Sequence, residues 1–221
     1  MTIIGLVTTD QGPNPEFVEA FQATMPGAEV RLVGALDGLS MNEIDDAAGG
    51  SSEYPIQTIL ADGSTRDIDL SFLAPLLGVR VSEMAGQGAE AIAICCAGDF
   101  PDFDCDVPVL YPGRLLSGMA SAVTTTGRIG VVSPIASQME SARANWERDG
   151  FEVKMAFASA FNEDEVEVAA RAMSDPSLEL VVLDCMDHTA VDRDEFARLC
   201  GRPVLAALPL TAQIASEIVV G

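Results

Sequence analysis

The sequence predicts an α/β protein with mainly parallel strands, built from two similar halves. Apolar runs of strand length alternate with amphipathic stretches along almost the whole 221-residue chain, and this alternation is typical of parallel α/β folds. Two short sequence segments of the first half, each a predicted strand and the turn after it, recur in the same order in the second half. The chain is also long enough to bury a full hydrophobic core, in one large domain or in two small lobes.

The expected elements follow one another as strand and helix through both halves. Short apolar runs bounded by turn residues predict buried strands, whereas longer stretches with an apolar period of about 3.6 residues predict helices. We expect strands at 3–8, 29–35, 91–95, 128–133, 152–158, 178–184 and 203–206, and helices at 16–23, 72–87, 114–125, 136–149, 162–173, 192–199 and 210–219.

The internal repeat places a cysteine where a strand stops in each half. Residues 4–8 are echoed by residues 129–133, and the strand that ends before Cys96 is echoed by the strand that ends before Cys185. The first half is longer between its two segments, which indicates an insertion at about residues 36–71. Without it, two similar α/β halves remain, and a pseudo-twofold arrangement would place their equivalent strand ends face to face across a cleft.

The inserted segment carries its own local signals. Ser40 followed by Glu43 is a capping-box pattern, which predicts the start of a short helix. Further on, the Asp62-Gly63 pair lies between two short apolar stretches, which predicts a β-hairpin turn.

The composition excludes several classes of partner. The chain has 34 acidic and 12 basic residues, a formal charge of −22, so its surface repels nucleic-acid backbones and anionic lipid. No stretch approaches the roughly 18 apolar residues that a membrane helix needs, and the first ten residues lack the parts of a secretory signal.

Five cysteines, two of them adjacent, do not fit a disulfide framework. We therefore expect a cytoplasmic protein with reduced thiols, no nucleic-acid partner and no membrane association.

Four loops at the expected carboxyl ends of strands carry polar or nucleophilic side chains. In parallel sheets, ligands bind at these ends, where loops expose backbone N–H groups and helices begin. The four loops are residues 8–10, 96–99, 133–134 and 185–189.

Cys96 and Cys185 are the candidate catalytic residues. Two thiols at equivalent strand ends could approach one substrate carbon from opposite sides, one removing a proton as a thiolate and the other returning a proton as a thiol. The reference thiol pKa of about 8.5 allows both states near neutral pH. This chemistry requires no metal and no organic cofactor. The alternative for a strand-end cysteine is a buried, inert thiol, which we expect for Cys95, Cys105 and Cys200.

His188 is the single histidine of the chain and follows Cys185 by three residues. This spacing admits a Cys–His hydrolase, and it equally admits a polar loop residue that lines a pocket or faces solvent. A zinc site is not expected, because one histidine and scattered cysteines lack paired ligand spacing.

Residues 96–101 and 183–188 resemble the AroM family within the aspartate/glutamate/hydantoin racemase superfamily. The resemblance implies two Rossmann-like lobes related by a pseudo-twofold axis, with an active-site cleft between them. The first lobe would span residues 1–120 and the second lobe residues 121–207, with the helix at 208–221 packing back on the first. Further matching segments are 5–7, 34–39, 112–114, 130–134 and 203–205.

The resemblance also implies roles for the strand-end residues. In characterised racemases of this superfamily two strand-end cysteines form the acid/base pair, and Cys96 and Cys185 stand at the matching positions. Small polar side chains and backbone N–H groups hold the substrate carboxylate. The implied partner is a small carboxylate- or carbonyl-containing metabolite, and family analogy favours a homodimer. The candidate substrate-binding residues are Thr8, Thr9, Gly98, Asp99, Ser133, Asp187, His188 and Thr189.

Three functional hypotheses follow. The first is a cofactor-independent racemase, epimerase or isomerase that acts at a carbon alpha to a carboxylate or carbonyl. The second is a decarboxylase or isomerase that needs one thiol, and the third is a non-catalytic small-molecule-binding protein on the same scaffold. Ala97-Gly98 and Met186 stand where such racemases usually have Asn-Thr and Thr, which points away from an ordinary amino-acid substrate.

Overall fold

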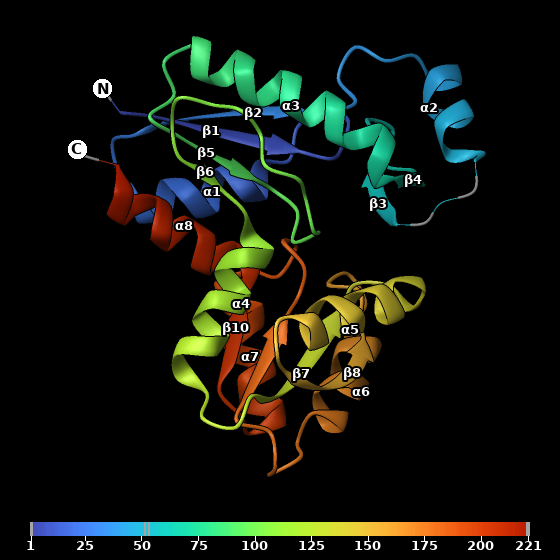
Figure 1. Ribbon diagram of the computed structural model, residues 1–221, viewed down its shortest axis with the longest axis vertical. Coiled ribbons are helices and arrows are strands. Elements are labelled where there is room, and N and C mark those ends of the chain that lie inside the picture. The colour runs from blue at the N-terminus through green and yellow to red at the C-terminus, as the bar shows by residue number, and fades with distance from the viewer. Residues whose placement is uncertain (1, 51, 53, 220–221) are drawn as a thin grey trace. The chain divides into compact units, whose positions relative to one another are not determined.

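A computed structural model describes residues 2–50, 52 and 54–219 of the chain. The chain divides into two compact units (Figure 1). The first unit comprises Met1–Tyr111 and Thr211–Gly221, and the second comprises Pro112–Leu210. In the part of the chain described here, no helix combines the length and the apolar character that a membrane span requires.

The first unit is built on a four-stranded parallel sheet of order β2-β1-β5-β6. Helix α3 runs along one face of this sheet, and α1 and α8 lie on the other face (Figure 1). The strands are β1 (Ile3–Thr8), β2 (Glu29–Gly34), β5 (Ala91–Ile94) and β6 (Val109–Leu110), and the helices are α1 (Pro15–Thr24), α3 (Leu70–Gly86) and α8 (Ala207–Ile218).

A helix and a two-stranded hairpin occupy the expected insertion. Helix α2 (Met41–Ala48) begins with the predicted capping box between Ser40 and Glu43. Strands β3 (Pro55–Ile59) and β4 (Thr65–Asp69) pair in antiparallel fashion, so the hairpin prediction is also confirmed.

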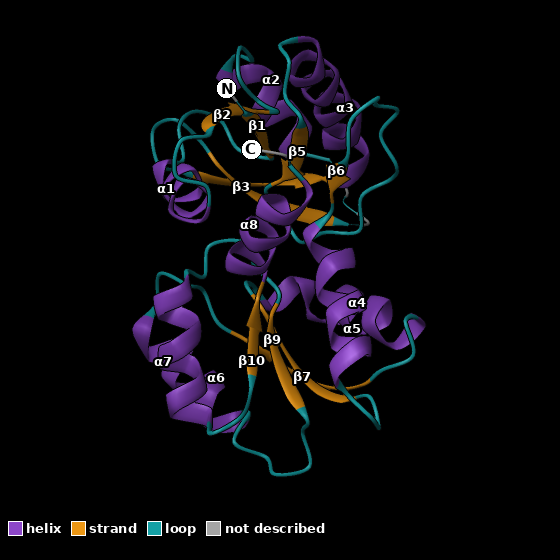
Figure 2. Ribbon diagram, turned by 90° about the vertical axis from the view of Figure 1, so that its left-hand side faces the viewer, coloured by secondary structure: helices purple, strands orange, loops and turns teal. Residues whose placement is uncertain are grey.

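The second unit repeats the architecture with a parallel sheet of order β10-β9-β7-β8. Helices α6 and α7 cover one face of this sheet, and α4 and α5 lie on the other (Figure 2). The strands are β7 (Arg128–Ser133), β8 (Glu152–Phe157), β9 (Leu180–Leu183) and β10 (Val204–Ala206); the helices are α4 (Pro112–Val123), the 3-10 turn η1 (Ala136–Gln138), α5 (Met139–Arg148), α6 (Glu163–Ala172) and α7 (Ala190–Cys200).

Equivalent glycines in β1 and β7 show how closely the helices pack against the two sheets. A Cβ atom on Gly5 would lie 3.1 Å from the Met84 side chain, and a Cβ on Gly130 would collide with the sulfur of Met173. In each unit a methionine at the end of a helix fills the space above the glycine, so the packing is repeated along with the topology.

The hydrogen-bond register identifies equivalent positions in the two sheets. The backbone N–H of the residue before Cys96 donates to the Val7 carbonyl at 2.8 Å, and the N–H of the residue before Cys185 donates to the Val132 carbonyl at 2.9 Å. Val7 and Val132 are the next-to-last residues of β1 and β7. Cys96 and Cys185 therefore occupy the same position in a duplicated architecture.

The α/β class and the mainly parallel, two-lobed organisation are confirmed, and each expected strand is present with bounds close to those predicted. The structure also contains one strand that the sequence did not predict, the two-residue β6. Two residues are too short to produce a recognisable apolar period. The expected helix at 136–149 begins as a 3-10 turn before continuing as α5.

Candidate functional site

In the first unit, two candidate loops emerge side by side because β1 and β5 are paired, parallel neighbours. Thr8 ends β1, Thr9 follows it, and both side chains are buried. The Thr8 hydroxyl accepts the backbone N–H of Asp10 at 3.2 Å, and the Thr8 carbonyl accepts the N–H of Ala35 at 2.8 Å. These contacts hold the start of the loop rigidly at the carboxyl edge of the sheet.

Cys96 lies in the turn after β5 and is half-buried, whereas its neighbour Cys95 is buried. Both cysteines follow β5, which ends at Ile94 and is buried on both faces, and the side chains become progressively more accessible as the chain leaves the core towards Asp99. Asp99, further along the turn, is exposed, and its backbone N–H donates to the Tyr54 hydroxyl at 3.4 Å. The turn thus presents a partly accessible thiol at the strand end, together with backbone groups.

The other cysteines differ from expectation at one position. All five carry thiols rather than disulfides, and Cys95 and Cys200 are buried as predicted. The prediction for Cys105 is wrong, because this residue is half-buried and packs against the first hydrophobic core from a long loop. A loop that lies over the core covers one side of a residue, whereas a strand or helix within the core covers all sides.

In the second unit, the loops after β7 and β9 are again neighbours, because these strands pair in parallel. Ser133 ends β7 and is buried, with its hydroxyl donating to the Ile135 carbonyl at 3.4 Å. The Cys185 thiol is half-buried and donates to Asp187 Oδ2 at 3.3 Å. Ser133 corresponds to Thr8 of the first unit, so each sheet pairs a strand-end hydroxyl with a strand-end thiol.

His188 and Thr189 complete this turn at the start of α7. The imidazole of His188 is buried, and burial lowers its pKa, against the opposing effect of Asp192. Within the described residues, its Nε2 has no hydrogen-bond partner, and the Cys185 thiol donates to Asp187. The structure therefore gives no support to a Cys–His pair. Thr189 caps α7 in a capping box with Asp192.

Asp184 is a site-adjacent residue that the sequence did not single out. Its carboxylate accepts the indole N–H of Trp146 at 3.0 Å, and burial raises its pKa to about 6 although part of the residue remains accessible. Its position directly before Cys185 was the available signal. Its partner lies 38 residues away, which no local pattern could reveal.

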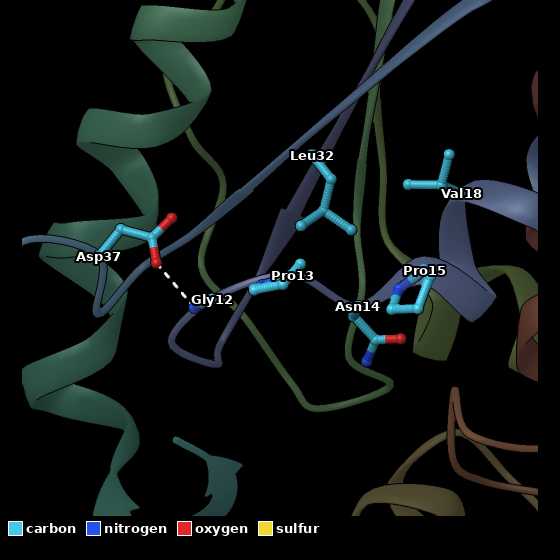
Figure 3. A pocket seen from close by; sticks show the side chains of 7 residues that line it. All are labelled: Gly12, Pro13, Asn14, Pro15, Val18, Leu32 and Asp37. Carbon is cyan, nitrogen blue, oxygen red and sulfur yellow. Dashed lines mark hydrogen bonds between the residues drawn. The ribbon is translucent and has the colours of Figure 1, made fainter. Parts of the chain in front are cut away.

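Asp37 is a second residue that sequence reasoning did not place in the site. Its carboxylate accepts the backbone N–H groups of Gly12 and Gly34, both at 2.8 Å. This clasp ties the loop after β1 to the end of β2, and the Gly12 bond is drawn in Figure 3. The signal for it lay in the segment 34–39, which carried part of the family resemblance.

A cavity of about 310 Å³ lies beside the clasp (Figure 3). Asp37 is the ionisable side chain of its lining, and backbone N–H groups already engage both of its oxygens. The carboxylate thus holds the loop after β1 beside the end of β2. The lining residues are Gly12, Pro13, Asn14, Pro15, Val18, Leu32 and Asp37.

Taken separately, each unit offers a thiol, a buried hydroxyl and the backbone of a strand-end turn. Such a set can hold a carboxylate by hydrogen bonds and transfer a proton through sulfur. Among the described residues, no group of three or more His, Cys, Asp or Glu side chains is arranged to hold a metal ion.

Solved structures with this fold are enzymes of several kinds. An allantoin racemase from Klebsiella pneumoniae aligns with a TM-score of 0.66 at 17% identity, covering 99% of this chain and 87% of that chain. An unliganded arylmalonate decarboxylase aligns with a TM-score of 0.65 at 13% identity, covering 100% of this chain and 94% of that chain. A maleate isomerase from Pseudomonas putida aligns with a TM-score of 0.65 at 10% identity, covering 98% of this chain and 92% of that chain. At these identities the similarity shows the fold alone, which this chain shares with two racemases, a decarboxylase and an isomerase.

The sequence comparison is more specific. No curated protein matches the chain closely enough to count as a relative. A family model described as AroM protein matches residues 4–219, nearly the whole chain. The protein therefore belongs to the AroM family.

Proposed function

We propose that the protein is a cofactor-independent enzyme that moves a proton at a carbon alpha to a carboxylate or carbonyl, with Cys96 and Cys185 as its acid/base pair. The observation that carries the proposal is the register of the two sheets, which puts these cysteines at equivalent positions after β5 and β9. Both thiols are half-buried, as a group that is held in place yet meets a substrate must be.

The proposed reaction needs both thiols on one substrate. One sulfur, as a thiolate, removes the proton, and the other adds a proton to the opposite side of the resulting carbanion. Hydroxyls and backbone N–H groups of the strand-end loops would hold the carboxylate, and the carbanion is stabilised where those dipoles point at developing charge. The binding residues in this proposal are Thr8, Thr9, Gly98, Ser133 and Thr189.

The comparisons support this class of activity and leave the substrate open. The neighbours with this fold include racemases, an isomerase and a decarboxylase. Racemisation at a carbon alpha to a carbonyl and decarboxylation of a malonate both pass through a carbanion next to that carbonyl. We therefore propose small carboxylates and cyclic ureides as the substrates to test first.

The test is deuterium exchange in D₂O, followed by proton NMR. The panel should hold glutamate, aspartate, allantoin, an arylmalonate and maleate. We expect exchange, isomerisation or decarboxylation of at least one compound by the wild-type protein. Cys96→Ala and Cys185→Ala should each slow the reaction by about 100-fold or more, the usual size of an acid/base contribution.

Cys105→Ala is the matched control, because it removes a half-buried thiol from the loop that follows β5. It should keep the wild-type rate. Loss of activity in Cys185→Ala alone would favour the single-thiol decarboxylase or isomerase. Full activity in both variants would rule out thiol acid/base chemistry, and binding without turnover would favour a non-catalytic small-molecule-binding protein.

A further inference from the structure

The first unit contains a cavity that the proposed reaction does not use. It has a volume of about 310 Å³ and lies beside the Asp37 clasp (Figure 3). The loop after β1, the start of α1 and the edge strand β2 form its walls. All of its lining residues belong to the first unit, and none of them is among the catalytic or binding residues proposed above. A ligand in this cavity would therefore contact residues outside the proposed catalytic set.

The cavity lies where α/β folds bind ligands. Parallel sheets bind small molecules outside the carboxyl ends of their strands, and in dinucleotide-binding folds an acidic side chain after the second strand accepts hydrogen bonds from ribose hydroxyls. Here β1 and β2 are paired, parallel neighbours, and Asp37 lies just beyond Gly34, the last residue of β2. A carboxylate at this place can hold a sugar.

The Asp37 carboxylate retains the capacity to accept two further hydrogen bonds. Its Oδ1 accepts the N–H of Gly12 and its Oδ2 accepts the N–H of Gly34, both at 2.8 Å. A carboxylate has about four acceptor positions, so about one position on each oxygen remains. The backbone bonds also fix the carboxylate in place. Two oxygens held in this way suit a pair of adjacent hydroxyl groups.

Much of the remaining lining is apolar. Leu32 and Val18 are half-buried, and Pro13 and Pro15 add two rings to the wall. In Figure 3 Asp37 stands at one end of the lining and Val18 towards the other, with Leu32 between them. A ligand that fits therefore has hydroxyl groups at one end, for the carboxylate, and an apolar or aromatic group at the other.

The size and charge of the cavity narrow the class of ligand. Small-molecule sites run from about 300 to 1,000 Å³, so a cavity of about 310 Å³ suits a nucleoside better than a dinucleotide. Pro13 and Pro15 have no backbone N–H to offer a phosphate. Asp37 and the formal charge of −22 repel a phosphate as well. These features favour a neutral ligand.

We propose that this cavity is a binding site for a nucleoside without a phosphate group, with the ribose diol on Asp37 and the base against Val18 and Leu32. The two hydroxyl groups donate to the two carboxylate oxygens, and the base buries its faces on the apolar wall. The bound nucleoside would meet the same carboxylate that ties the loop after β1 to β2. Binding here needs no thiol chemistry, so this site and the proposed reaction stand or fall separately.

Isothermal titration calorimetry of the wild-type protein with adenosine, guanosine, cytidine and uridine tests the site. At least one of them should bind with a Kd below about 1 mM. The 2′-deoxy form of that nucleoside should bind at least about tenfold more weakly, because it lacks one donor to a charged acceptor. Its 5′-monophosphate should also bind more weakly, because the phosphate charge would lie near Asp37.

Val18→Phe is the blocking variant, because it adds a ring to the cavity wall and leaves the Asp37 clasp in place. It should weaken nucleoside binding by at least about tenfold. Val79→Phe is the matched control, because Val79 is 54% exposed on α3 and lies outside the cavity lining. This control should bind as the wild-type protein does. Asp37→Asn would break part of the clasp, so the deoxynucleoside tests the diol instead.

Three results would overturn the proposal: no binding of any of the four nucleosides, equal binding of the ribose and deoxyribose forms, or undiminished binding by folded Val18→Phe. Agmatine, a guanidine that can use the same two oxygens, represents the other class of ligand. Binding of agmatine in place of the nucleosides would also overturn the proposal and would assign the cavity to a cation. If Val18→Phe does not fold, the comparison of ribose and deoxyribose forms on the wild-type protein decides the outcome.

Discussion

At the residue scale, Asp184 shows how the fold changes the chemistry of a side chain. Burial raises the pKa of its carboxyl group from 3.8 to about 6, and the hydrogen bond from Trp146 opposes this rise. Desolvation has the larger effect on the pKa, because one hydrogen bond from a neutral indole N–H replaces only part of the hydration that the carboxylate loses on burial. Asp184, the residue directly before Cys185, therefore gives up its proton only near pH 6.

Asp184→Asn should stabilise the protein near neutral pH. Because the folded pKa lies above the unfolded value, ionisation costs stability as the pH rises from about 4 to about 6, and the cost is complete above that range. Two pKa units correspond to at most about 3 kcal/mol, and asparagine can still accept the bond from Trp146. Urea unfolding at pH 7.5 should show most of this gain, and at pH 4 the gain should be close to zero.

The same substitution at Asp175 is the matched control with the opposite sign. Hydrogen bonds from Ser177 and Lys154 hold the pKa of the Asp175 carboxyl well below its usual range. Asp175→Asn should therefore lose stability at pH 7.5. A gain in both variants would mean that general charge repulsion in this acidic chain, and not burial, explains the Asp184 result.

At the element scale, the carboxyl edge of the first sheet depends on close backbone packing. Gly34 ends β2, and a Cβ atom there would overlap the carbonyl oxygen of Asp10 and lie 3.0 Å from Asp37 Oδ1. The Asp10 carboxylate in turn accepts the N–H of Ile59 at 2.8 Å. One glycine thus permits the loop after β1, the clasp and the hairpin to meet at this edge.

Gly34→Ala should destabilise the protein by about 2 kcal/mol or more, because the colliding atom belongs to the backbone and cannot rotate away. Gly118→Ala adds the same methyl group inside α4, where nothing lies within 4 Å. That control should gain up to about 1 kcal/mol from higher helix propensity. Thermal unfolding of both variants checks the pair, and equal melting temperatures would contradict the packing argument.

At the scale of the whole molecule, the chain is a duplicated α/β unit with one insertion and one returning helix. The second unit, Pro112–Leu210, is continuous in sequence, whereas the first unit needs the segment that begins at Thr211. Thr211, Ala212 and Ala215 are completely buried, so α8 contributes to a core.

A fragment of residues 112–210 should therefore fold alone, since a compact unit with its own core can do so. Circular dichroism with urea should show a cooperative transition for it. A fragment of residues 1–111 lacks α8 and should show a weaker transition or none, and adding residues 207–219 through a linker should restore it. A non-cooperative 112–210 fragment would contradict the independence of the second unit.

Local patterns were sufficient for most of the secondary structure and for the positions of the two candidate thiols. The apolar period locates strands and helices, the Ser40–Glu43 capping box begins α2, and the repeat marks Cys96 and Cys185 at strand ends. Each of these patterns involves residues close together in the sequence, so it can be recognised without the tertiary structure. Strand β6 was missed because two residues carry too little of the pattern.

Only the folded chain decides which polar groups meet. Three features join residues that packing brings together: the bond from Trp146 to Asp184, the clasp of Asp37 on two backbone N–H groups, and the approach of the Phe100 ring to Gly98, where an added Cβ atom would lie 3.1 Å from the ring. Their energies depend on burial and on distances of a few tenths of an ångström, which composition and spacing do not encode. The sequence therefore located the candidate chemistry, and the three-dimensional structure determined the electrostatic surroundings in which each group must work.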